Sequence, residues 1–404
     1  MKKFAIAACV FLVLTLFPAA VHATDDNGSG NGTDTSQQTD EIRQEVEDQI
    51  QGIDLNEWDR VLNSVPDQAR GVLGDGSLGE IIGKFAEGGT QVDPVNLIEL
   101  VFKLLLGEMG SQIGLLISLV ALAILSGLLT NLRSSFSSEG VGEIAHYVIY
   151  LLMATVLVHL LWQCVGTARD AVNAMVDLMQ ALFPILITVL TAMGNAAAAG
   201  VFQPAMAMLT GAVSSFIRDV ILPLVMMSGL IGVISRMSER FPVKRMGTVL
   251  GTGVKWATGI IFTLFLGVMT LQGLNAAALD GITIRTAKFT IDKAIPVVGG
   301  YMSDTVDTLL GCSLIVKNAA GATGLISIVA VLLTPLIRLL AVALSLKIAA
   351  ALIEPVSDKR LSECMDSVSS TVTMLFVVVL SVGAMFFIAV SLILGAGNVS
   401  VMMR

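Results

Sequence analysis

The sequence predicts an all-α polytopic membrane protein with about six transmembrane helices in three hairpins, two broken or re-entrant elements, and a small helical N-terminal extracytoplasmic region. Three observations lead to this prediction. Of the 404 residues, 54% are hydrophobic and only 14% are charged, whereas about a quarter of the residues in soluble domains are charged. Six apolar runs are each long enough to cross a bilayer. Two further apolar stretches are interrupted by proline, glycine or asparagine.

Residues 1–23 have the pattern of a secretory signal peptide. Lys2 and Lys3 precede an apolar core, and Val21-His22-Ala23 has the small residues of a cleavage site. We therefore expect cleavage between Ala23 and Thr24. An uncleaved first span is the alternative, although an apolar core of about fourteen residues is short for a transmembrane helix.

The segment after this site is strongly acidic, with 16 acidic and 4 basic side chains between residues 24 and 95. Residues 24–40 lack large apolar side chains and are predicted to be a disordered acidic linker. Residues 41–95 show helical spacing of apolar residues, such as Leu55, Trp58 and Leu62, and are predicted to form amphipathic extracytoplasmic helices. They form either a docking surface or lid on the membrane, or simple solvated helices that lead into the first span.

Residues 96–404 form the predicted multi-span domain. Its apolar runs are 109–131, 144–166, 206–235, 256–278, 322–346 and 370–395. Six spans place the connections 132–143, 236–255 and 347–369 on one side, and these hold nine basic residues. The positive-inside rule then places this side in the cytoplasm and the N-terminal region outside. Seven spans are the alternative, with residues 181–202 as a further full span.

The two interrupted stretches are residues 181–202 and 294–318. Their predicted helix breaks are Pro184, Asn195, Pro296, Gly299 and Gly300. Because unsatisfied backbone groups are not tolerated in lipid, such elements line water or pack on protein. An amphipathic helix on the outer surface is the alternative for 294–318. Similar motifs follow both stretches, so 181–278 and 294–395 form a possible internal repeat. The alternative is chance similarity between apolar segments.

The sequence shows no pattern typical of an enzyme, a cofactor site or a metal site. His146 and His159 are the only histidines outside the signal peptide, and about 140° separates them around a helix. The nearly neutral membrane body also predicts no nucleic-acid partner, since such a partner requires a basic surface. We therefore expect a protein that acts without catalysis and without a cofactor.

Charged residues inside the apolar runs are the candidate functional residues. A charge at mid-bilayer costs about 2.5–3.5 kcal/mol on insertion scales, so such residues face a partner or water. The candidates for a polar path are Arg338, Arg218, Asp219, Asp304 and Asp307, with the arginines pairing with the aspartates. The alternatives are arginines that snorkel to the membrane surface or form a structural ion pair.

The stretch from Pro296, continued by "GCSLIVKNAAGATG", resembles the stage III sporulation protein AE family of endospore-forming bacteria. The matching positions include Gly311, Cys312, Lys317 and Asn318. The "EPVSDKR" loop at 354–360 and the acidic N-terminal region agree with this resemblance, which extends over nearly the whole chain. No catalytic residues carry over from the family.

The resemblance implies a permease-like membrane subunit of a transenvelope channel between mother cell and forespore. It implies a location in the mother-cell membrane around the forespore. It also implies that late gene expression in the forespore requires the protein. The implied partners are other stage III sporulation A proteins and a forespore-side channel protein, in addition to the lipid bilayer. Two functions compete: a transport subunit, and a non-conducting, export-gate-like scaffold that assembles the channel.

Overall fold

The computed structural model describes residues 55–63, 78–86, 94–133, 139–193, 196–237, 244–294, 299–355 and 357–402. The predicted signal peptide, its cleavage site at Ala23 and Thr24, and the linker 24–40 lie outside these residues. So do Asn195 and Pro296.

All regular elements of the described residues are helices, which confirms the predicted all-α class. Two short helices, α4 (Asn56–Asn63) and α6 (Leu78–Ala86), precede the bundle. The bundle consists of α7 (Pro94–Ser111), α8 (Ile113–Arg133), α9 (Glu139–Ala192), α10 (Ala196–Phe216), α11 (Leu222–Met237), α12 (Lys244–Ala294), α13 (Gly299–Ile353) and α14 (Lys359–Met402). A π-helical turn, η1 (Ile217–Ile221), joins α10 directly to α11.

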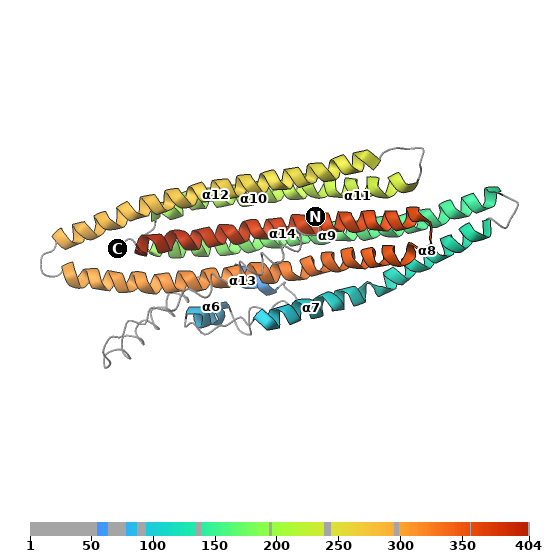
Figure 1. The fold of residues 1–404 in the computed structure, drawn as a ribbon. Coiled ribbons are helices and arrows are strands. Elements are labelled where there is room, and N and C mark those ends of the chain that lie inside the picture. Colours follow the sequence, from blue (N-terminus) through green and yellow to red (C-terminus); the bar gives the residue numbers. More distant parts are fainter. Residues whose placement is uncertain are drawn as a thin grey trace.

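The long helices run antiparallel to one another in an elongated bundle (Figure 1). Helices α8, α11 and α13 finish at the same end of the bundle at which α9, α12 and α14 begin. We call this the basic end, because it carries Arg133, Arg236, Lys244, Arg245, Lys347, Lys359 and Arg360. The helices thus alternate in direction, as the predicted order of the apolar runs requires. This alternation places the three basic connections at the same end of the bundle.

Five helices are long and apolar enough to cross a membrane, and a bent pair brings the number to six if it counts as one span. These figures refer to the described part of the chain. The bent pair is Glu99–Ser111 with Ile113–Leu128, which meet at 48°. The predicted number of about six spans therefore holds, and the bend at Gln112 was not predicted.

Several helices are much longer than a bilayer is thick. Helices α9 and α13 have 54 and 55 residues, which correspond to about 81 and 83 Å at 1.5 Å per residue. The hydrocarbon core of a bilayer measures about 30 Å. The bundle therefore extends well beyond a membrane that its apolar segments cross. We call the end opposite to the basic end the distal end.

The stretch 181–202 is interrupted between Ala192 and Ala196, where the break at Asn195 was predicted, but the predicted break at Pro184 is wrong. Pro184 lies inside α9, which continues unbroken to Ala192, and α10 begins at Ala196. The chain reverses between these two helices, so the stretch is the tip of a helical hairpin. Leu182, Ile185 and Leu186 are buried on both sides of Pro184. This packing holds α9 together, because tertiary contacts compensate for the one hydrogen bond that proline removes.

The second stretch, 294–318, is also not re-entrant. Helix α12 ends at Ala294 and α13 begins at Gly299, so the break around Pro296 is the connection between two antiparallel helices. Gly299 and Gly300 are the first residues of α13, which is continuous from there to Ile353. The two halves of the possible repeat therefore begin differently, since the chain reverses between α9 and α10 at the start of the first and is continuous in α13 at the start of the second.

Close approach of helices through glycine holds the centre of the bundle together. Gly321 and Gly383 lie where α13 meets α14, and a Cβ atom at either position would collide with Leu394 or Leu332 of the opposite helix. Gly324 has the same relation to Leu182 on α9. The α13–α14 contact is the most extensive one in the bundle. Small residues are the usual means of close helix packing in membranes, because lipid provides no hydrophobic drive for association.

We predict that Gly321→Val destabilises the protein by about 1–3 kcal/mol, the usual effect of overpacking. Three atoms at the end of Leu394 stand within 3.0 Å of the new Cβ position, so the whole side chain must move. The control is Gly267→Val, because Gly267 of α12 has open space around it. Thermal unfolding of the purified protein in detergent measures both, and equal stability of the two variants would contradict the prediction.

Candidate functional site

Two of the predicted polar-path residues lie together on the π-helical turn η1. The Arg218 guanidinium is 3.5 Å from Asp219 Oδ1, and its Nη1 donates a hydrogen bond to Asn173 Oδ1 of α9 at 3.2 Å. Its Nη2 lies 3.4 Å from Ser215 Oγ. The side chain of Arg218 is 39% exposed. This cluster ties η1 to α9, and π-helical turns inside α-helices often occur at functional sites.

Arg338 does not join this arrangement with Asp304 or Asp307. All three belong to the continuous helix α13, in which a separation of 31 residues corresponds to about 46 Å along the axis. Pairing of Arg338 with either aspartate inside one chain is therefore wrong. Arg338 is exposed on the outside of the bundle, and the side chains of Asp304 and Asp307 lie outside the described residues.

The family-motif residues alternate between the inside and the outside of α13. Cys312 and Lys317 are buried, with Lys317 only 1% exposed, whereas Gly311 and Asn318 are exposed. Helices α6, α7 and α9 pack along α13. The buried half of the motif is therefore part of the packing between α13 and its neighbours.

The N-terminal helices are seated on the bundle, so they are not simple solvated helices. Trp58 of α4 is fully buried, and its Nε1 donates a hydrogen bond to Ser327 Oγ of α13 at 3.2 Å. Ile81 and Ile82 of α6 are also buried. Helix α4 contacts α9, and α6 contacts α13. These contacts agree with the predicted lid, although the lid covers protein.

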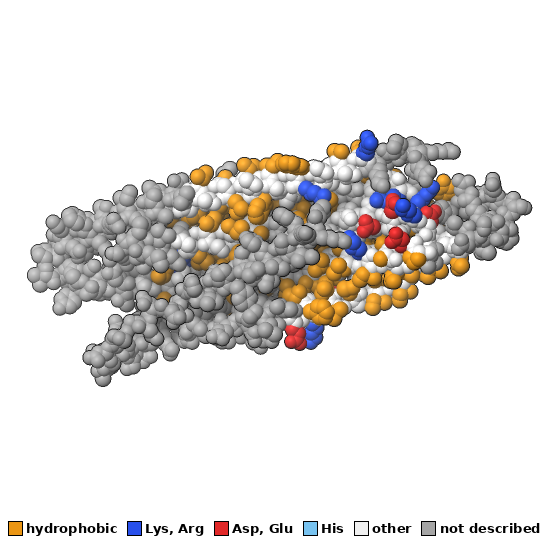
Figure 2. Space-filling view, viewed as in Figure 1, with side chains coloured by type: hydrophobic (Ala, Val, Ile, Leu, Met, Phe, Trp, Pro, Cys, Tyr) orange, Lys and Arg blue, Asp and Glu red, His pale blue; other side chains and the backbone are white. Residues whose placement is uncertain are grey.

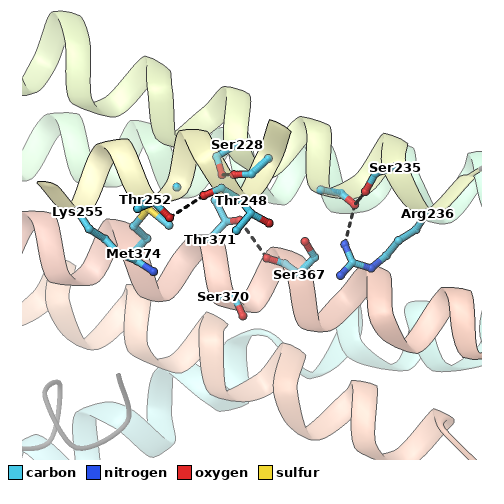
Figure 3. A pocket seen from close by; sticks show the side chains of 13 residues that line it. Ser228, Ser235, Arg236, Thr248, Thr252, Lys255, Ser367, Ser370, Thr371 and Met374 are labelled. Carbon is cyan, nitrogen blue, oxygen red and sulfur yellow. Dashed lines mark hydrogen bonds between the residues drawn. The ribbon is translucent and has the colours of Figure 1, made fainter. Parts of the chain in front are cut away.

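A polar cavity of about 190 Å³ lies between α11, α12 and α14 near the basic end (Figure 3). We use the name polar cavity for this space. Each helix contributes one stripe of small or polar residues at helical spacing. The stripe of α12 consists of Gly247, Thr248, Gly251, Thr252 and Lys255. The stripes of α11 and α14 include Ser228, Gly232, Arg236, Ser367, Thr371 and Met374.

The hydroxyl groups of the polar cavity bond mainly to backbone carbonyls. Ser228 Oγ donates to Gly247 O at 3.0 Å and joins α11 to α12. Thr252 Oγ1 donates to Thr248 O at 2.8 Å, and Thr371 Oγ1 to Ser367 O at 3.0 Å. The two threonine bonds satisfy their hydroxyls within their own helices, which lets the cavity remain open between three helices.

Cationic groups stand at both ends of the polar cavity. At the basic end, Arg236 Nη1 donates to Gly232 O at 2.8 Å, and its Nε is 3.5 Å from Glu363 Oε2 of α14. Lys255 stands at the other end, beside Met374 (Figure 3). Lys255 forms no ion pair with any described carboxylate. Charged side chains gather toward the basic end, whereas the middle of the visible surface is mainly hydrophobic (Figure 2).

The polar cavity was not predicted, although its signal is present in the sequence. The segments "SGLIGVISR" at 228–236 and "GTVLGTGVK" at 247–255 carry Gly, Ser and Thr at spacings of three or four residues. Such spacing places them on one helix face. The sequence indicates the stripes, but only the packing of α11 against α12 and α14 shows that the stripes face one another.

No group of three His, Cys, Asp or Glu side chains in the described ranges could hold a metal ion. The three cysteines there, Cys164, Cys312 and Cys364, are buried and form no disulfide with a described cysteine. The chemistry of the polar cavity therefore comes from hydroxyls, one guanidinium and one ammonium group.

The fold defines a multi-span helical membrane protein with a polar cavity between three spans. Residues 77–397 match the family described as stage III sporulation protein AE, and the chain therefore belongs to this family. It is 28% identical over 393 residues to "Stage III sporulation protein AE" of Bacillus subtilis (strain 168). This match covers 97% of the chain and 98% of the relative. No solved structure matches. The protein is thus a sporulation-related membrane protein, as the resemblance predicted.

We predict that Trp58→Ala releases α4 from the bundle. Truncation of a buried tryptophan costs about 3–5 kcal/mol, and a helix of eight residues is not stable without its contacts to the bundle. Hydrogen exchange of residues 56–63 should become fast while α13 stays protected. The control is Ser327→Ala, which removes only the hydrogen bond, worth about 0.5–1.5 kcal/mol. Unchanged exchange in Trp58→Ala would contradict the seated position of α4.

Proposed function

We propose that the protein is a multi-pass subunit of a sporulation-specific channel complex between mother cell and forespore, in which it has a permease-like role. In this proposal it lies in the mother-cell membrane that surrounds the forespore, with the N-terminal region outside the cytoplasm. It acts with other stage III sporulation A proteins and a forespore-side channel protein, and it supports late gene expression in the forespore without enzymatic activity.

The polar cavity is the observation that supports a permease-like role. It lies between three helices that are long and apolar enough to span a membrane, yet hydroxyls and two cations line it. Lipid-facing surfaces exclude such groups, so a polar space between spans is typical of proteins that bind or pass solutes. Gly251 keeps the space open, because a Cβ atom there would lie 3.2 Å from Met374 Cε and 3.3 Å from Ser228 Oγ.

Filling the polar cavity tests this proposal. We expect Gly251→Leu to lower the yield of heat-resistant spores by orders of magnitude, because the new side chain occupies the space between Ser228 and Met374. The matched control is Gly253→Leu, two residues along α12, which faces open space and should sporulate normally. Immunoblots of membrane fractions must show equal amounts of both variants. Normal sporulation of Gly251→Leu at a normal protein level would overturn the permease-like role.

A second function, that of a non-conducting scaffold, is supported by the length of the helices. At the distal end, α12 and α13 continue beyond their apolar segments into sequence that carries Asp280, Arg285, Lys288, Asp292, Asp304 and Asp307. A charged helical end outside the bilayer is suited to contacts with other proteins. In this function, the protein organises the channel through its distal end and passes no solute.

The scaffold function predicts that Asp304→Lys combined with Asp307→Lys weakens co-purification with the other stage III sporulation A proteins. Reversal of two charges replaces attraction to a basic partner surface by repulsion, which changes association strongly. Asp366→Lys, at the basic end, is the control. The two functions separate clearly, since Gly251→Leu should leave co-purification intact. If the distal variant retains its partners, the distal end is not the docking surface.

A further inference from the structure

We propose that the polar cavity binds a small oxyanion, either as a free ion or as the phosphate of a lipid headgroup. The inference deepens the proposed permease-like role, because the biological purpose of such a site rests on that role. Binding itself can be measured without transport. It depends on the charge, the donors and the size of the cavity.

The charge of the lining favours an anion. Arg236 and Lys255 both line the polar cavity, and none of its described lining residues is acidic. Glu363 of α14 faces the Nε side of Arg236 at 3.5 Å and balances part of that charge. Lys255 has no such counter-charge among the described carboxylates. Lys255 is exposed at its end of the cavity, and an ammonium group on a membrane helix requires an opposite charge or water, so an oxyanion at the cavity supplies the opposite charge.

The donors of the polar cavity are those that proteins use for phosphate and carboxylate groups. The Lys255 ammonium carries three N–H groups, and the Arg236 guanidinium adds further N–H donors. Lys255 follows Gly251 by four residues and Thr252 by three, so it projects from the same face of α12 that lines the cavity. Ser367 faces Gly232 from the opposite wall, because a Cβ atom at Gly232 would collide with Ser367 Oγ.

The volume of the polar cavity limits the size of the ligand. A cavity of 190 Å³ is smaller than the pockets of about 300–1,000 Å³ that hold drug-sized molecules. It has room for a phosphate or a short carboxylate with a few waters, and not for a nucleotide. The position near the basic end also brings it within reach of lipid headgroups, so the two sources of the oxyanion must be tested separately.

The experiment uses the full-length protein in nanodiscs of neutral phosphatidylcholine, with radiolabelled inorganic phosphate as the probe. A parallel arm adds phosphatidylglycerol and counts retained lipid by native mass spectrometry. We expect saturable binding in one arm, weakened about tenfold or more in Lys255→Met and in Arg236→Gln. Arg245→Gln is the matched control, because Arg245 is exposed on the same helix and does not line the polar cavity.

Arg236 also connects α11 to α14, so Arg236→Lys tests its charge with less risk to the fold. Binding of neither probe to the wild type, or equal binding to wild type and Lys255→Met, would overturn the inference. Phosphate binding identifies a free ion, and phosphatidylglycerol retention alone identifies a lipid. If Lys255→Met no longer binds the probe but sporulates normally, the oxyanion site is supported and the proposed permease-like role is contradicted.

Discussion

The structure depends on the close approach of α13 to α14. Glycines at this contact and at the α13–α9 contact bring the backbones together, so that leucines of one helix lie over bare backbone of the next. In lipid the hydrophobic effect does not drive the association of helices, so close van der Waals packing must stabilise their contacts. Phe265 of α12 and Phe386 of α14, with ring centroids 6.4 Å apart in an edge-to-face arrangement, extend the packing to the next helix. The remaining helices are arranged around this centre.

The same packing principle produces the polar cavity. Gly232, Gly247 and Gly251 allow α11, α12 and α14 to come together, and at Gly232 and Gly251 a serine hydroxyl stands opposite in place of the leucines found at the α13–α14 contact. Hydroxyls that bond to the preceding turn of their own helix bring little bulk and leave no unsatisfied donor. The protein thus uses glycine in two ways. Where a glycine lies opposite leucine, the two helices pack closely. Where it lies opposite hydroxyl groups, a cavity remains that two cationic side chains line.

Much of the fold was predictable because hydrophobic length and charge are local properties. The six apolar runs, the ends of α12 and α13 around Pro296 and the shared position of the basic connections all follow from such patterns. The helix break at Pro184 was predicted wrongly because a proline indicates only that a break is allowed. At Pro184 the buried neighbours Leu182 and Ile185 keep the helix straight. Arg218 and Asp219 were paired correctly since they are adjacent. The polar cavity depends on three helices far apart in sequence, which no local pattern shows.

The hydrogen bond between Trp58 and Ser327 joins residues that are 269 positions apart. A ribosome makes the chain from its N-terminus, so α4 exists long before the surface that receives it. A segment that is synthesised early therefore cannot take its place until α13 has been made. Until then the indole has no partner on α13, and a chain that stops short of Ser327 leaves it without one. Burial of Trp58 accordingly requires that α9 and α13 are already in place.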